Sequence, residues 1–155
     1  MLLNEIKYCP GTLAEGYATY SRGCLSKVFR GKKVHHILPY ESPTSNSETD
    51  ELFNDNRKRM SISGVQKKFS VLLEKNKLRL INEGEQGEYI LKPIPRTGKR
   101  QEHMPANEHL TMQIAKQAYG IETAENALIF FKNEIPAYIT KRFDLKKDGS
   151  KLAQE

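Results

Sequence analysis

The sequence predicts an α+β fold, in which an antiparallel sheet with one main helix follows a short N-terminal region. Three observations support this class. Short apolar segments separated by turn residues lie between Phe69 and Lys92, one longer segment with helical spacing follows near Glu108, and two further apolar segments come after Gly120. Strands, then one helix, then strands is an order typical of α+β domains, and the sequence shows no internal repeat.

The first part of the chain is expected to be a small region, residues 1–40, followed by a linker, residues 41–56. Short apolar and aromatic patches are separated by four glycines that indicate turns, and Cys24–Phe29 is a predicted short helix. The linker is rich in Ser, Thr, Asn, Asp and Glu. Residues 57–155 then form the best organised part.

Three strands are predicted first in that part, and they are Phe69–Glu74, Leu78–Ile81 and Glu88–Lys92. A turn at Lys75–Lys77 joins the first two. Pro93 and Pro95 are expected to stop the third, because proline cannot donate to a ladder.

The main helix is expected to begin at Glu108 with Asn107 as its N-cap and to end at Gly120. Leu110, Ile114 and Ala118 recur at helical spacing. The last two strands are predicted at residues 123–131 and 135–143, with a turn at Asn133–Glu134.

Composition gives weaker guidance. The 155 residues suffice for one domain or one lobe, and they contain neither a membrane-length apolar run nor a secretory signal. We therefore expect a cytoplasmic protein without a membrane partner. The net charge of +6 permits nucleic acid, nucleotide phosphates or an acidic partner. Basic residues cluster around residues 57–68 and 92–100, although a charge run is usually a solvated face.

The two cysteines, Cys9 and Cys24, are expected to be reduced and buried. With His35 or His36 they could form a zinc site, but the spacings match no standard pattern. The two histidines are expected at the surface.

Three segments could carry chemistry. Ser61–Lys68 is a small-residue loop whose backbone N–H groups and lysines suit phosphate, although it matches no standard phosphate-binding motif. Lys92 ends a strand and needs an anion, which Glu108 could supply, while His109 beside it is expected at the surface. Thr140–Asp144 ends the last strand. Taken singly, each has an ordinary structural interpretation: a hairpin entrance, a solvent-reaching lysine and an exposed strand end.

Taken together, these segments resemble HipA-like serine/threonine kinases, the toxins of a bacterial toxin–antitoxin class. The resemblance rests on SISGVQKKFSVLL, YILKP, NEHLTMQIAKQAYGI and AYITKRFD, which begin at residues 61, 89, 107 and 137, and it covers about Met60–Glu155. The order of elements is that of a kinase small lobe, so the expected sheet and helix are small-lobe-like.

The resemblance implies a role for each matching residue, with ATP as the ligand and magnesium in a complete kinase. The glycine-rich nucleotide loop would be Ser63, Gly64, Val65, Gln66, Lys67 and Lys68. Lys92 would contact the phosphates with Glu108 as its partner, and Lys141, Arg142 and Phe143 would contact adenine. Ser61 or Ser63 would be autophosphorylated, which would add negative charge beside the nucleotide phosphates.

The family's catalytic aspartate, magnesium ligands and large lobe lie beyond the matching segments. Asp144 and Asp148 are the only late aspartates, and neither lies in a recognisable catalytic loop. We therefore expect no catalytic residue, and no kinase activity, in this chain alone.

The resemblance also implies partners: the missing large lobe, an antitoxin, indirect contact with operator DNA, and a phosphorylated target in the translation machinery. Two alternatives remain open. The chain could be a separate interaction module that regulates a HipA-like kinase or antitoxin, or a basic DNA-contacting module, although no standard nucleic-acid-binding motif is present.

Overall fold

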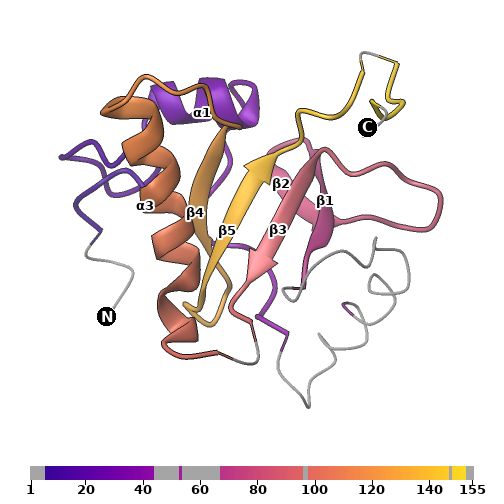
Figure 1. Cartoon of the computed structure of the whole chain (residues 1–155). Coiled ribbons are helices and arrows are strands. Elements are labelled where there is room, and N and C mark those ends of the chain that lie inside the picture. The colour runs from indigo at the N-terminus through magenta and orange to yellow at the C-terminus, as the bar shows by residue number, and fades with distance from the viewer. Residues whose placement is uncertain (1–5, 44–52, 54–66, 96–97, 147, 153–155) are drawn as a thin grey trace.

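The computed structural model describes residues 6–43, 53, 67–95, 98–146 and 148–152 (Figure 1). The helices are α1 (Arg22–Phe29), a 3-10 helix η2 (Gln101–His103) and α3 (Met104–Gln117). The strands are β1 (Phe69–Glu74), β2 (Lys77–Leu80), β3 (Tyr89–Pro93), β4 (Asn126–Phe130) and β5 (Pro136–Lys141). The α+β class with one main helix is confirmed.

The strands form one antiparallel sheet in the order β2-β1-β3-β5-β4. The register pairs Phe69 with Leu91, Lys92 with Tyr138, and Leu128 with Tyr138. The long connection from β3 to β4 carries α3, so β5 can enter the sheet between β3 and β4.

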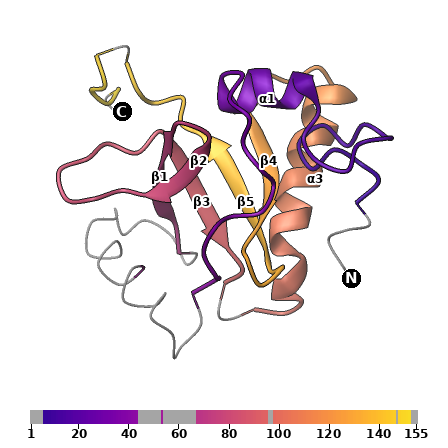
Figure 2. The ribbon, with the colours of Figure 1, turned by 180° about the vertical axis from the view of Figure 1, so that it is seen from behind.

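The two faces of the sheet are covered differently (Figures 1 and 2). α3 crosses the face of β4 and β5, and among the described residues no helix covers the same face of β3, β1 and β2. α1 and the rest of the N-terminal region lie against the opposite face, where the Tyr89 hydroxyl donates to the Val28 carbonyl at 2.8 Å. Alternation along β1 and β3 therefore points Phe69, Val71, Tyr89 and Leu91 into this second layer.

The core is a single apolar cluster between the sheet and the N-terminal region. Phe29 packs against Tyr20 and Tyr89, with ring centroids 5.0 and 5.9 Å apart. Phe53, from the predicted linker, is fully buried and lies 4.5 Å from the ring of Phe69. Residues on both sides of the predicted linker therefore share one core.

The N-terminal region also covers the outer edge of β4. Phe130 donates its backbone N–H to His36, and Leu38 donates to Phe130, with a parallel bridge between Ile37 and Phe130. Leu128 donates to the Pro10 carbonyl and accepts the Tyr20 hydroxyl at 2.7 Å. These bonds pair backbone groups at the edge of β4 that would otherwise be free to bind another strand.

Most element positions agree with the sequence prediction, but the predicted start of the main helix was wrong. α3 begins at Met104, not Glu108, and Asn107 lies within its first turn instead of capping it. The first turn tolerates Pro105, whose missing N–H has no intrahelical acceptor there. The helix itself ends at Gln117; Gly120 follows with φ 65°, and Ile121 bonds back to Ala115.

The strands are also slightly different in extent. β4 and β5 are shorter than predicted, because residues 123–125 and 131 of the first, and 135 and 142–143 of the second, lie outside the strands. β3 includes Pro93 as its last residue, opposite Ala137. Within the described ranges, no helix is long and apolar enough to cross a membrane.

Candidate functional site

The candidate site centres on an ion pair between β3 and α3. The Lys92 ammonium contacts the Glu108 carboxylate, and the two side chains are 19% and 32% exposed. Lys92 also lies over the Tyr138 ring, 5.2 Å from its centroid. The pairing that the sequence suggested is therefore present, and it lies on the sheet face that carries α3.

Local structure explains why Lys92 occupies this position. It alternates with the buried residues Leu91 and Pro93, so its side chain leaves the core face. The neighbouring Tyr138 on β5 is buried, and burial raises the pKa of its phenol to about 12. Tyr138 is therefore neutral, and Glu108 is the charge that balances Lys92 at this point.

Polar contacts fix α3 against β4. Asn126 accepts hydrogen bonds from His109 Nδ1 at 2.8 Å and from Gln113 Nε2 at 3.2 Å. At the other end, Lys116 pairs with Glu125 at 2.6 Å. Because Glu108 adjoins His109, these contacts set the rotation of the helix that presents Glu108 to Lys92.

His109 was predicted at the surface, and this was wrong, since it is only 1% exposed. Burial lowers the pKa of its imidazole. Asn126 Oδ1 only accepts, so Nδ1 carries the proton. Asn126 and Gln113 were not singled out from the sequence, although a polar residue opening the apolar segment NALIF is a signal that could have found Asn126.

The predicted nucleotide loop lies mostly outside the described residues. This applies to Ser61 and to four of the loop positions: Ser63, Gly64, Val65 and Gln66. Lys67 and Lys68 are described, partly buried, and directly precede β1. Because Phe69 pairs with Leu91, this start of β1 lies beside the end of β3 that carries Lys92.

The predicted adenine-contacting segment leaves the opposite end of β5. Lys141 pairs with Tyr89, three residues along β3 from Lys92, which corresponds to about 10 Å. Arg142 donates to both Asp144 oxygens, at 2.8 and 2.5 Å, and this guanidinium lowers the Asp144 pKa. Phe143 is 81% exposed. A ligand that touched both Lys92 and Phe143 would have to be extended along the strands.

The cysteine and histidine alternative is not assembled as a metal site. Cys9 and Cys24 are buried free thiols, as predicted. His36 is buried rather than at the surface, with Nδ1 2.9 Å from Thr19 Oγ1, whereas His35 is exposed. Across the parts of the chain that the structure describes, no three His, Cys, Asp or Glu side chains form a cluster that could hold a metal ion.

Comparison with known proteins identifies the family. The family model described as "HipA-like C-terminal domain" matches residues 60–155, which is more than half of the chain and includes every element from β1 to β5. This chain belongs to the HipA-like family. Residues 6–43, which cover the second face of the sheet, lie outside the matched range.

The similarity to one relative covers more of the chain than the family model does. This relative is a Haemophilus influenzae protein named "Putative kinase", 34% identical over 124 residues. The match covers 77% of the HipA-like chain but 34% of the relative. The chain thus spans about a third of that relative's length, so the relative contains a large part with no counterpart here.

Proposed function

We propose that this chain is the ATP-binding small lobe of a HipA-like protein serine/threonine kinase. The observation that carries the proposal is the Lys92–Glu108 ion pair in a chain of the HipA-like family. In protein kinases, a lysine on the third strand contacts the nucleotide phosphates and pairs with a glutamate of the following helix. Lys92 and Glu108 have this strand, helix and pairing.

Each residue of the proposed site has a physical task. ATP, when bound, supplies the phosphoryl group. Lys92 neutralises phosphate charge, and Glu108 holds the ammonium in place while it is partly removed from water. The adenine end of the nucleotide contacts Lys141, Arg142 and Phe143. The exposed Phe143 ring offers it an apolar surface.

The loop Ser63–Lys68 is proposed to cover the phosphates, with Lys67 and Lys68 adding positive charge. Autophosphorylation at Ser61 or Ser63 would place about −1.5 to −2 charge beside the nucleotide and weaken its binding. Phosphate mapping of a complete, active kinase checks this, and a map without phosphate on either serine would contradict it.

The rest of the proposed activity depends on parts outside the matched segments. Phosphoryl transfer requires a residue that orients the acceptor hydroxyl and ligands for magnesium. Asp144 is engaged by Arg142, and Asp148 accepts from Ser150, so both are occupied locally. We propose that the chain alone is inactive, and that with a large lobe it phosphorylates a protein of the translation machinery under the control of an antitoxin.

The test is an NMR titration with Mg-ATP, comparing the native chain with Lys92→Met and Glu108→Gln. We expect joint, saturable shifts at Lys67, Lys92 and Phe143, and at least about a tenfold weaker affinity in Lys92→Met. Glu108→Gln should weaken binding less, because it removes only the partner. Lys32→Met, at an exposed lysine in the segment after α1, is the matched control and should bind as the native chain does.

Two results would count against the proposal. One is ATP binding that Lys92→Met leaves unchanged. The other is the absence of saturation both in this chain and in a longer chain that includes the large lobe. Equal affinity for ATP and for any polyanion, with a steep fall at high salt, would instead favour the nucleic-acid alternative.

A second candidate is an interaction module that binds a separate HipA-like kinase or an antitoxin. It is favoured by the outer side of α3, where Leu110 and Ile114 are 47% and 45% exposed. Tight kinase or antitoxin binding that is lost on Leu110→Gln, together with no effect of ATP, would distinguish this role.

A further inference from the structure

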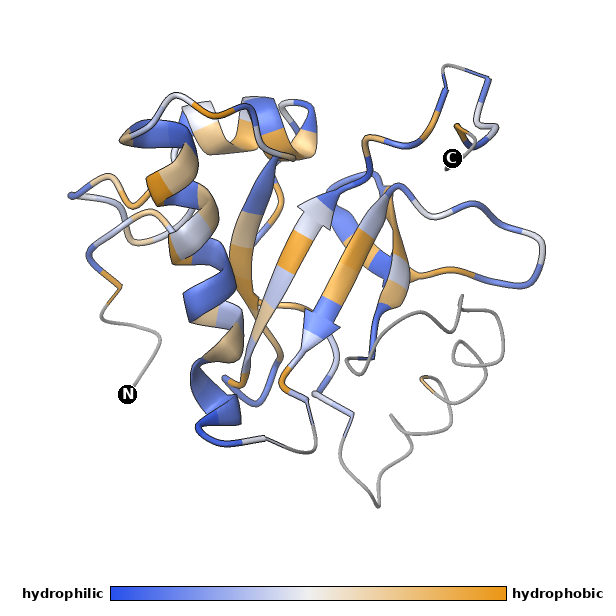
Figure 3. Ribbon diagram, viewed as in Figure 1, coloured by the Kyte–Doolittle hydropathy of each residue, from blue (hydrophilic) through white to orange (hydrophobic). Residues whose placement is uncertain are grey.

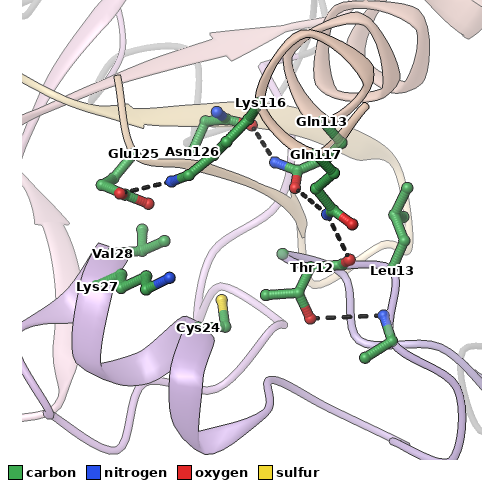
Figure 4. Close-up of a pocket in the computed structure, with 12 residues that line it drawn as sticks. Thr12, Leu13, Cys24, Lys27, Val28, Gln113, Lys116, Gln117, Glu125 and Asn126 are labelled. Atoms are coloured by element: carbon green, nitrogen blue, oxygen red, sulfur yellow. Dashed lines mark hydrogen bonds and ion pairs between the residues drawn. The ribbon is translucent and has the colours of Figure 1, made fainter. Parts of the chain in front are cut away.

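A pocket of about 370 Å³, lined by polar and apolar groups in similar measure, lies beside the second half of α3 (Figure 4). Four segments enclose it: the loop 11–14, α1, the second half of α3, and residues 125–126 at the start of β4. The volume lies within the range of small-molecule sites, which begins at about 300 Å³. Eight residues, or about 12 Å of helix, separate Glu108 from Lys116 in the pocket wall.

One wall of the pocket is held in place by a chain of amide hydrogen bonds. Gln117 Nε2 donates to the Thr12 carbonyl at 3.0 Å and to Gln113 Oε1 at 2.8 Å. Gln113 donates in turn to Asn126, and both of these side chains are buried. The wall is thus organised without a ligand, which reduces the entropy that binding would cost.

The charges of the pocket are unequal. Lys116 and Glu125 neutralise each other at 2.6 Å. Lys27 makes no ion pair or hydrogen bond within the described part of the chain, and Figure 4 shows its ammonium directed into the pocket. The hydrogen bond with Cys9 and, after it, burial raise the pKa of the Cys24 thiol, which is therefore neutral. The lining carries one uncompensated positive charge.

We propose that this pocket binds a small oxyanion, the carboxylate or phosphate group of a metabolite, with Lys27 as its main cationic contact. Lys116 lies on the opposite wall, where it stays paired with Glu125, and the Gln117 amide lines the same space. The site is separate from the Lys92–Glu108 pair and does not depend on the nucleotide-binding proposal.

The experiment is an NMR titration of the full chain with inorganic phosphate and, separately, with citrate, at an ionic strength held constant with sodium chloride. We expect saturable shifts at Lys27, Lys116 and Gln117, and at least tenfold weaker binding in Lys27→Met. Lys32→Met is the matched control, because Lys32 is also exposed but does not line the pocket. Saturation by phosphate alone assigns the site to phosphate groups, and saturation by citrate alone assigns it to carboxylates.

The remaining outcomes overturn the proposal. They are the absence of saturable shifts with both anions, binding that Lys27→Met leaves unchanged, or binding that Lys92→Met abolishes. The last result would place the anion at the proposed nucleotide site. Retention of the native spectrum by each variant shows that it is folded, so a loss of binding reports on the pocket.

Discussion

At the scale of single residues, two buried histidines, His36 and His109, have charges that depend on the fold. Burial lowers the pKa of His36 from an ordinary value of 6.5 to about 4, and the neighbouring His35 contributes. Burial lowers the pKa of His109 as well. The Nε2 atom of each ring is buried without a hydrogen-bond partner within the described structure. Both rings are therefore held neutral at pH 7.

These shifts predict acid sensitivity. Below pH 6.5 the unfolded chain binds a proton at His36, whereas the folded chain does not until about pH 4. The stability that neutral, buried His36 contributes is fully present above pH 6.5 and is lost as the pH falls towards 4. Protonation of His36 in the unfolded chain lowers the free energy of unfolding by about 1.4 kcal/mol per pH unit in this window. Urea unfolding between pH 7 and pH 5 measures it.

A pair of variants identifies the source of the slope. His36→Gln should reduce the pH dependence of the unfolding free energy by up to the slope that one bound proton causes, which is about 1.4 kcal/mol per pH unit. His103→Gln, at an exposed histidine, tests whether removal of any histidine has the same effect. An unchanged slope in His36→Gln would mean that its burial does not contribute.

At the scale of elements, α3 has the reverse of the usual distribution of polarity. The buried residues of its inner side include His109 and Gln113, whereas Leu110 and Ile114 are exposed. Figure 3 shows hydrophilic positions interspersed with apolar ones along the helix. The inner side is nonetheless stable because Asn126 accepts from both buried donors.

This arrangement predicts that polar contacts matter more to α3 than its apolar stripe. Asn126→Ala leaves two buried donors without an acceptor and should lower the free energy of unfolding by about 2 kcal/mol or more. Leu110→Gln and Ile114→Gln should each change it by less than about 0.5 kcal/mol, because both positions are exposed. Chemical denaturation of the three variants tests the contrast, and a larger loss from Leu110→Gln would contradict it.

At the scale of the whole molecule, residues 6–43 and the sheet depend on each other. The N-terminal region supplies fully buried Phe29 and Cys9 and covers the β4 edge (Figure 2). The core face of the sheet, including Tyr89, Leu91 and Ile139, has no other apolar cover of that extent among the described residues. The boundary at residue 40 is therefore not a boundary of the core.

Removal of residues 1–40 should abolish cooperative unfolding. The exposed core face should bind a hydrophobic dye, and thermal melts followed by circular dichroism should lose their sigmoidal form. Full-length Phe29→Ala is the milder comparison, with an expected loss of about 3–5 kcal/mol. A cooperative melt of the shortened chain would show that the sheet is stable by itself.

Much of the local structure was predictable because it depends on nearest neighbours in the chain. Alternating apolar residues identified β1 correctly at Phe69–Glu74, and helical spacing identified α3. The start of α3 was missed because Asn107 resembles a cap, while the actual start uses Pro105 in the first turn. Of the candidate site, the Lys92–Glu108 pairing was predictable, because a lysine on the third strand and a glutamate in the following helix match the pattern of protein kinases.

The sequence by itself determined the α+β class, the order of its elements and membership of the HipA-like family, because periodicity and motif residues are local properties. Only the tertiary structure decided that His109 is buried while Leu110 is exposed, and that Lys27 and Lys116 line one pocket. These features depend on which side of α3 meets the sheet and on how the N-terminal region folds back over it. Contacts of α3 with Asn126, 13 and 17 positions away, decide the first, and contacts such as that of Phe130 with His36, about ninety positions apart, decide the second. No local pattern encodes either.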